Sequence, residues 1–416
     1  MDIKFITKDK LRAEAKSKIE SGIIVPHDQM CDVVSPVLNG RSGKIGPTDA
    51  LFDRAMKAKT VGRESIMVGK LAKEYGSGFD IPRFCHGKDK EMSVREMLKA
   101  GVFNDTKMSS NSLIPDWQSL WDALRIDISI RKAAQGTIRE NIYNIENMPN
   151  SSKIFKSTEF FPYAVIFEEN NGEGQSVRQG ETRAGQYEDI EHFIYAAGFT
   201  WTLLADLFDE SLNTTRISDA VSVGYDAKRD DLAISPILNF SYSGAQQTAA
   251  STVGTQRQEL LYNTIQDAID DLAERVDPVT LRKIDASDLT ILASPNDARH
   301  ISQVIGGFNT NTVGGQDAPK SLDALSEISQ IIAYDGEVIE GRAETTTYSG
   351  VTNGTAYLIR KNRYMNVGIK RNLQMESDMT PDVTKLSQEE RSWYFVEGQQ
   401  TTGIQYFIQE ITLPTW

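Results

Sequence analysis

The sequence predicts a soluble α+β protein, because helical and strand patterns both occur along its 416 residues. Apolar residues recur at helical spacing over 201–235 and again over 261–276. A short apolar strand at 289–293 precedes a third helix, and residues 355–413 carry the alternation typical of half-buried strands. At roughly 100–200 residues per domain, a chain of this length predicts two or three domains.

The composition is that of a globular chain, with 39% hydrophobic and 25% charged residues. No run of about 18 apolar residues occurs and residues 1–20 are charged, so we expect neither a membrane span nor a secretory signal. Cys31 and Cys85 are too few for a disulfide framework, which fits a reducing cytoplasm.

Charge is distributed unevenly along the chain. Residues 1–107 carry a net charge of +5, whereas the remainder carries −18. We therefore expect weak, non-specific contact with phosphate by the first part of the chain. Sequence-specific reading of DNA is not expected from an acidic body.

The first 107 residues look like a separate, mostly helical extension, interrupted near Gly40 and Gly76. The next stretch reads as an arm, with apolar residues at helical spacing and then a strand-like alternation from Ile126 to Ile130. Apolar residues on such an arm need a neighbouring subunit to cover them. The arm residues assigned to this contact are Trp117, Leu120, Trp121 and Leu124.

A long polar loop is the most unusual feature of the sequence. An apolar strand at 163–167 leads into a polar tip at 168–189, and the chain returns through 190–201. Connections in compact domains are usually about 4–6 residues long, and this tip has too few apolar residues to fold onto its own domain. We therefore expect it to lie on another subunit. The loop residues assigned to this contact are Gly172, Gly174, Arg178, Gly180 and Arg183.

The middle of the chain predicts helices with clear boundaries. The first begins near Trp201 and is expected to stop at Pro236, and a linker at 241–255 separates it from the helix ending at Asp277. After the strand at 289–293, Ser294 is the expected N-cap of the next helix. Pro295 then occupies its first position and Asp297 lies three residues after the cap.

The last third predicts three strands. Residues 366–376 form a long strand with one polar face, and a second strand covers 392–397. The third strand, 404–413, is expected to pair with the second as a hairpin around 398–403.

The sequence contains no convincing catalytic, nucleotide-binding or metal-binding motif. The segment 172–177 starts like a dinucleotide loop but lacks the third glycine, and no Gly-x-Ser-x-Gly motif occurs. We expect no catalytic site, no metal and no cofactor. Ordinary packing accounts for His27, Cys31, Cys85 and His86, and solvated helix faces account for the pairs Asp206/Glu210 and Asp270/Asp271. No Ser or Cys nucleophile in a recognisable motif accompanies His192 or His300.

Taken in order, these elements resemble the major capsid proteins of tailed double-stranded DNA bacteriophages, whose Hong Kong 97-like capsid fold is shared with encapsulins. Local sequence is also similar: Tyr195–Gly198 before the spine helix, Ala293–Pro295 before an axial-domain helix, Gly354–Leu358 at the late strands and Glu390-Arg391 at the penultimate strand. No single motif is diagnostic; the resemblance rests on order and spacing over about 300 residues.

The resemblance implies a division of the chain into an N-terminal helical extension (1–107), an N-terminal arm (108–157), an extended loop (158–195), a peripheral domain with the spine helix (196–240 and 351–416) and an axial domain (241–350). It also implies a non-enzymatic shell protein of the virion, assembled in the host cytoplasm from pentamers and hexamers of identical subunits. Portal, scaffold and decoration proteins, and packaged DNA contacted non-specifically, are the implied partners; no membrane is.

Some relatives cross-link their shells through a loop lysine, but residues 168–189 contain no lysine. An arginine stays protonated and cannot replace it. We expect Arg178 and Arg183 to reach carboxylates of an adjoining subunit instead. The candidate acceptors are Glu376, Asp378 and Asp382. Two alternatives stay open: an encapsulin-type compartment, and an α/β enzyme without a recognisable motif.

Overall fold

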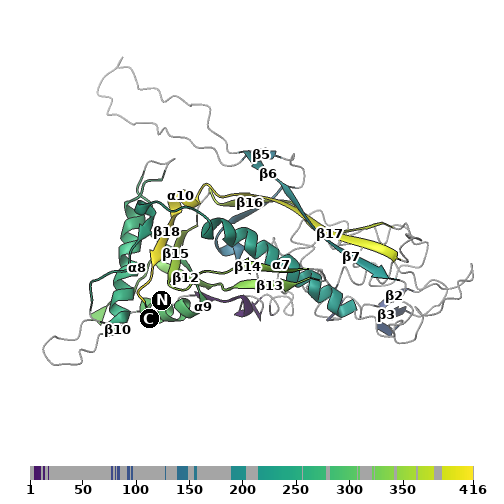
Figure 1. Cartoon of the computed structure of the whole chain (residues 1–416), viewed down its shortest axis with the longest axis horizontal. Helices are drawn as coiled ribbons and strands as arrows, with labels where there is room; N and C mark the ends of the chain where they lie inside the picture. Colours follow the sequence, from purple (N-terminus) through teal and green to yellow (C-terminus); the bar gives the residue numbers. More distant parts are fainter. Residues whose placement is uncertain are drawn as a thin grey trace, which may run out of the picture.

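The computed structural model describes residues 4–10, 13–14, 17, 76–77, 80, 82–84, 91–93, 95–96, 127, 138–148, 154–156, 189–202, 214–254, 256–277, 282–306, 308–309, 321–322, 324–341, 344–361, 364–378 and 387–415. These residues form a compact end, built around one mixed sheet, and a long limb in which strands run beside a helix (Figure 1). The α+β prediction is confirmed.

The compact end contains a six-stranded sheet. Its order is β1 (Lys4–Ile6), β12 (Ile328–Ala333), β9 (Leu289–Ala293), β15 (Thr355–Arg360), β18 (Ile408–Thr412) and β8 (Gln247–Thr248). The first three strands are parallel, whereas β15 is antiparallel to both of its neighbours. Two helices, α8 (Arg257–Glu274) and α9 (Pro295–Ile305), accompany this sheet.

This sheet is buried on both faces. In β9, Leu289 and Ile291 belong to the core that contains α8 and α9, whereas Leu292 belongs to a second core with Ile234 and Ile237 of the long helix. Successive strand residues point to opposite faces, so a strand covered on both sides needs a continuous apolar run. The sequence of β9, LTILA, meets that requirement.

Helix α9 begins as the sequence predicts. The Ser294 hydroxyl accepts a hydrogen bond from the Asp297 backbone N–H at 3.1 Å, and Pro295 occupies the first helical turn. The Asp297 carboxylate also accepts a bond from the Gly354 backbone N–H at 2.9 Å. The cap therefore ties α9 to the turn before β15.

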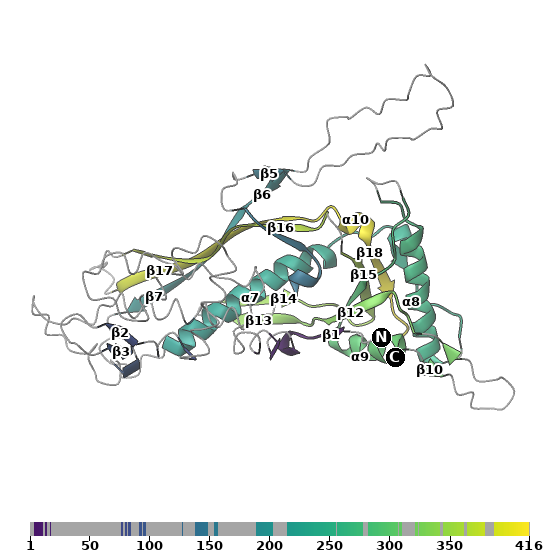
Figure 2. The ribbon, with the colours of Figure 1, turned by 180° about the vertical axis from the view of Figure 1, so that it is seen from behind.

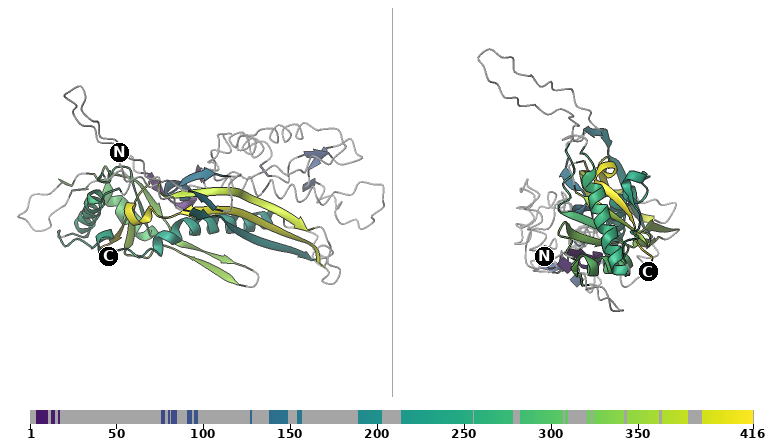
Figure 3. Two further views of the ribbon diagram at one scale, coloured as in Figure 1. Left: turned by 90° about the horizontal axis from the view of Figure 1, so that it is seen from above. Right: turned by 90° about the vertical axis from the view of Figure 1, so that its left-hand side faces the viewer.

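The limb contains a four-stranded sheet and the longest helix. The sheet order is β4 (Asn144–Asn147), β16 (Asn366–Asp378), β17 (Ser387–Gln400) and β7 (Phe193–Thr202). Helix α7 (Thr214–Leu238) runs between this sheet and the hairpin of β13 (Gly336–Glu340) and β14 (Thr345–Ser349) (Figure 2). The view from above shows strands and helix leaving the compact end together (Figure 3).

The remaining elements are short: β2 (Pro82–Phe84), β3 (Glu91–Ser93), η4 (Arg139–Asn141), β5 (Ile154–Lys156), β6 (Asp189–Glu191), η5 (Gly244–Gln246), β10 (Phe308–Asn309), β11 (Ser321–Leu322) and α10 (Ile404–Phe407).

Three predicted boundaries of the middle elements are wrong. Trp201 lies in β7, and the long helix begins at Thr214. Pro236 lies inside α7, which ends at Leu238. Proline has no backbone N–H, but at this position its absence removes only one hydrogen bond of the last helical turn, so the helix continues for two more residues. The expected linker 241–255 contains η5 and β8, and β8 pairs with β18 as the last strand of the central sheet.

The predicted C-terminal hairpin is also wrong. Strand β17 pairs with β16 and β7, whereas β18 pairs with β15 and β8. Residues 404–407 form α10, and Ile408 and Ile411 are completely buried in the central sheet. Burial of those side chains, rather than a local turn, decides the partner of β18. Strands β15 and β18 therefore belong to the compact end, although both lie within the expected peripheral segment 351–416.

The expected separate, helical extension is incorrect at its first residues, because Lys4–Ile6 pairs in parallel with β12. Other described parts of 1–107 include the β2–β3 hairpin. The predicted strand at 163–167 and most of the alternation at 126–130 lie outside the described residues.

Candidate assembly elements

The structure describes the base of the long loop. Strands β5 and β6 pair antiparallel, with Phe155 opposite Ile190 and Lys156 opposite Asp189. The two ends of segment 157–188 therefore meet at this ribbon. The predicted loop residues Gly172, Gly174, Arg178, Gly180 and Arg183 lie outside the described residues, as do the arm residues Trp117, Leu120, Trp121 and Leu124.

The predicted loop acceptors are only partly described. Glu376 and Asp378 lie in β16, opposite Ser392 and Glu390 of β17. Asp382 lies outside the described residues. The two described candidates thus share the far end of the limb sheet.

Strand β7 leaves apolar side chains in solvent immediately after the loop base. Phe193 is 53% exposed and Ile194 is 70% exposed. In the described four-stranded sheet β7 is an edge strand, so no described strand pairs with its outer side. An exposed edge with adjacent apolar side chains is the kind of surface that proteins cover with another chain.

Aromatic contacts hold α7 against the limb sheet. Phe395 of β17 stacks on Tyr195 of β7 at 5.0 Å between ring centroids and meets Tyr225 of α7 edge-on at 4.9 Å. The Lys228 ammonium lies 5.8 Å from the Tyr195 ring and 5.4 Å from the ring of Tyr348 in β14. Lys228 thus connects the sheet to the hairpin across the helix.

A buried ion pair connects β17 of the limb sheet to η4. Arg139 donates to the Glu397 carboxylate at 2.7 Å, and the two side chains are 1% and 5% exposed. The Nε atom of Arg229 in α7 lies 3.9 Å from the same carboxylate, and its guanidinium lies 4.9 Å from the Tyr225 ring. Glu397 therefore sits between two arginines from different elements.

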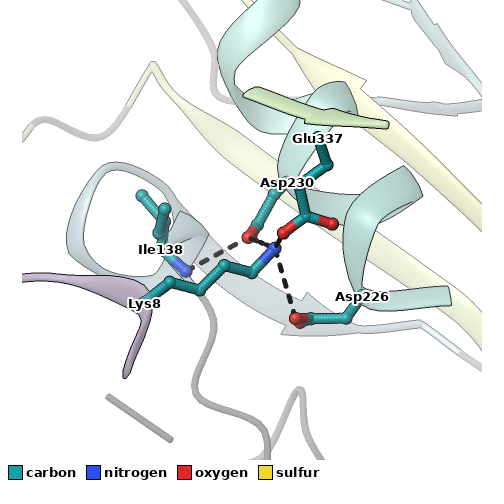
Figure 4. Close-up of polar contacts among 5 residues, drawn as sticks. All are labelled: Lys8, Ile138, Asp226, Asp230 and Glu337. Atoms are coloured by element: carbon teal, nitrogen blue, oxygen red, sulfur yellow. Dashed lines mark hydrogen bonds and ion pairs between the residues drawn. The ribbon is translucent and has the colours of Figure 1, made fainter. Parts of the chain in front are cut away.

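A second charge cluster lies on α7 beside the hairpin (Figure 4). The Lys8 ammonium lies 2.9 Å from the Asp230 carboxylate and 3.4 Å from that of Asp226, and it also pairs with Glu337 of β13. Asp230 additionally accepts a bond from the Ile138 backbone N–H at 3.4 Å. The cluster joins the N-terminal segment, η4, α7 and β13 at one point.

The pKa shifts indicate a structural role for this cluster. Burial by itself lowers the pKa of Lys8, but Asp230, Asp226 and Glu337 together raise it above its ordinary value. Burial raises the pKa of Asp230, and Lys8 opposes that rise. A lysine that acts as a base or nucleophile needs a lowered pKa, so Lys8 serves as a fixed counter-charge.

The remaining candidates divide into described and undescribed residues. His192 is buried next to β7, and Asp271 accepts a hydrogen bond from the Thr248 hydroxyl at 2.6 Å. His27, Cys31, Cys85, His86, Asp206 and Glu210 lie outside the described residues. Within the described ranges no group of three or more His, Cys, Asp or Glu side chains is placed to hold a metal ion. No helix in the same ranges is long and apolar enough to cross a bilayer.

Sequence reasoning missed both charge clusters. Asp226, Arg229 and Asp230 have the spacing that places them on one face of a helix, beside apolar residues that become buried. That pattern could have indicated buried charge on α7. No local pattern identifies Lys8 or Glu397 as the partners, because they lie far away in the sequence.

Comparisons with known proteins gave structural likenesses only. No protein-family model matches the chain, and no curated protein matches it. The chain is similar to the mature capsid of bacteriophage PhiM1 (TM-score 0.44, 10% identity, covering 68% of this chain and 88% of that chain). It is also similar to the capsid of a native GTA particle (TM-score 0.42, 10% identity, 66% and 89% covered) and to a virus-like particle from Pyrococcus furiosus (TM-score 0.37, 11% identity, 67% and 92% covered). Because all three TM-scores lie below 0.5, we base the proposed function on the chain's own sequence and architecture.

Proposed function

We propose that this chain is the major capsid protein of a tailed bacteriophage, and that it assembles into the icosahedral shell around a double-stranded DNA genome. The observation that carries the proposal is the limb: long strands β16, β17 and β7 run beside α7, and the base of a long loop adjoins β7 (Figure 1). An elongated subunit of this kind leaves large surfaces for neighbours.

The exposed start of β7 supports assembly through this limb. Phe193 and Ile194 present apolar area beside the loop base, where a neighbouring subunit can cover it. Head-to-tail contacts between identical subunits close into rings when the rotation fits, which yields the proposed pentamers and hexamers. Stable contacts of this type bury about 1,200–2,000 Å².

We propose a separate role in assembly for each segment expected from the sequence. The arm residues, with Trp117 and Trp121 among them, cover a neighbour's surface, and Arg178 and Arg183 bind carboxylates such as Glu376 and Asp378 across the interface. The net +5 charge of residues 1–107 favours an inward position near packaged DNA. Portal, scaffold and decoration proteins are the proposed further partners, with assembly in the host cytoplasm.

The shell that we propose is held without covalent cross-links, because the loop segment 168–189 contains no lysine. Boiling in detergent and reductant should release a single band of monomer size from purified particles. A ladder of larger bands under those conditions would contradict this part of the proposal.

Negative-stain microscopy and sedimentation of the recombinant chain test the main proposal. Closed, uniform shells are the expected result, formed over some range of salt and protein concentration. A protein that sediments only as a monomer under all conditions would refute it. Nuclease-resistant DNA in particles from infected cells, rather than enclosed protein, would separate a virion shell from a compartment of the encapsulin type.

A further inference from the structure

The first described residues of the chain complete the central sheet. Strand β1 extends β12 in parallel, with Lys4 opposite Gln330, Phe5 opposite Ile331 and Ile6 opposite Ile332. The Ile6 side chain is 1% exposed and belongs to the core shared with α7, whereas Phe5 packs against the core that contains α8 and α9. A five-residue segment therefore contributes to both cores.

Two residues after Ile6, the Lys8 ammonium lies among three carboxylates and pairs with all of them (Figure 4). Asp230 is completely buried, and Asp226 is 7% exposed at its side chain. Without the lysine, Asp226, Asp230 and Glu337 would face one another in a poorly solvated site, and unpaired buried charge is strongly destabilising. The edge of β12 and these carboxylates together form a binding site, here called the acceptor site. It fits the sequence of residues 5–8, in which two apolar residues are followed by a threonine and a lysine.

A long stretch of sequence separates this segment from the next part of the chain that reaches the cluster. Residues 9–137 separate Lys8 from Ile138, where the described chain rejoins the same cluster. The entropy of closing a loop grows only slowly with its length, and the effective concentration of a tethered segment falls roughly as the −3/2 power of the tether length. At so large a separation in sequence, belonging to the same chain gives a strand little advantage over an identical strand of a touching subunit.

We propose that this acceptor site is filled in assembled particles by residues 4–8 of a second copy of the chain. The inference rests on the self-assembly proposed above. The same contacts form whether the strand comes from the same chain or from a neighbour, so exchange requires no new interface at the acceptor site. Each subunit would then be linked to its neighbour through a strand that both cores require.

Disulfide trapping in mixed particles tests the proposal. Cys31 and Cys85 are first replaced by serine, and two variants are made in that background: Lys4→Cys and Gln330→Cys, which the register places opposite each other. The two variants are assembled together and oxidised. Exchange predicts a disulfide-linked dimer on a non-reducing gel, and a Lys10→Cys variant, displaced from this register, should give much less dimer.

The chain carrying both cysteines is the matched comparison. If mixed particles form but give no dimer, while the double variant forms only a link within one chain, strand exchange is refuted and assembly is retained. If sedimentation shows no particles even for the wild type, the proposed function fails instead.

A second measurement avoids cysteine variants that fold poorly. A fluorescent peptide of residues 1–12 is added while wild-type chains assemble, and its incorporation is compared with that of the Lys8→Glu peptide. We expect at least about tenfold lower incorporation of the Lys8→Glu peptide, which corresponds to about 1.4 kcal/mol. Equal incorporation of both peptides, or none of either, would contradict an exchangeable acceptor site.

Discussion

The compact end and the limb are stabilised in different ways. In the compact end, β9 and β12 bury apolar side chains on both faces, and Ile291 and Ile331 are completely buried. The limb also buries apolar side chains such as Val367 of β16, but it adds aromatic contacts and the buried Glu397 pair, and it leaves Phe193 and Ile194 exposed. The compact end therefore resembles the core of an ordinary domain, whereas the limb has exposed apolar side chains that a neighbouring subunit can cover.

The largest effect is expected from breaking the buried ion pair of the limb. Glu397→Gln removes the charge that Arg139 pairs with at 2.7 Å and leaves a buried guanidinium uncompensated. Loss of one partner of a buried pair destabilises by about 3–5 kcal/mol. Urea denaturation of the dissociated subunit should show that loss.

The matched control replaces both members of the pair, as Arg139→Met with Glu397→Leu. Removing both charges leaves no unpaired partner at this bond, so the double variant should be more stable than Glu397→Gln. Arg229 also lies near Glu397, so recovery is expected to be partial. If the single variant were as stable as wild type, the limb would not depend on this pair.

The apolar core of the compact end should give the next largest effect. Ile291→Ala removes a completely buried side chain from β9 and should lower the free energy of unfolding by about 2–5 kcal/mol. Ile194→Ala, at a position that is 70% exposed, is the control and should change it by less than about 0.5 kcal/mol. Equal losses at the two positions would contradict the contrast between the regions.

The sequence predicted elements that have local signals and missed contacts between distant segments. The helices α8 and α9, the N-cap at Ser294 and strand β16 were predicted because spacing, caps and alternation are local signals. The pairing of β18 with β15 was missed, because it depends on which distant strand buries Ile408 and Ile411. Residues that join distant segments, such as Lys8 and Glu337, leave no local pattern at all.

The cluster around Lys8 predicts a pH dependence with a definite sign. The pKa of Asp230 is raised by burial, so the folded state holds its proton more tightly than the unfolded chain, in which the pKa is about 4. Between neutral pH and that value, protonation of Asp230 should therefore stabilise the fold as the pH falls. The pKa of Lys8 is raised, so its contribution to stability is fully present below its ordinary value of 10.5 and is lost as the pH rises through the higher value of the folded state.

The measurement compares wild type with Asp230→Asn at pH 7 and at about pH 4, the two ends of this window. The stability of wild type relative to the variant should rise as the pH falls, because only wild type takes up this proton. Ala220→Ser, on an exposed part of α7, is the control and should not change the slope, because neither side chain titrates in this range. A difference that stays constant between the two pH values would show that Asp230 is not the group responsible.

The exposed start of β7 should affect assembly and not folding. Phe193→Ser with Ile194→Ser removes apolar area that is exposed in the subunit, so its melting should change little. If this surface lies in an interface, particle yield should fall markedly in sedimentation. Val253→Ser is the control, since Val253 is 69% exposed and precedes α8 of the compact end. Equal yields from all variants would place the interface elsewhere.

The smallest effect per subunit concerns the loop arginines. One exposed ion pair is worth only about 0.2–1 kcal/mol, which cannot hold two subunits together. Repeated in every subunit of a closed shell, however, the same pair would bias assembly strongly and make it sensitive to salt.

Arg183→Glu should therefore leave the melting of the subunit unchanged and lower particle yield, most clearly at low salt. Glu376→Arg or Asp378→Arg in the same chain should restore the yield if either is the acceptor. Particles of Arg183→Glu that form as well as wild type at both low and high salt would show that the loop binds its neighbour by other means.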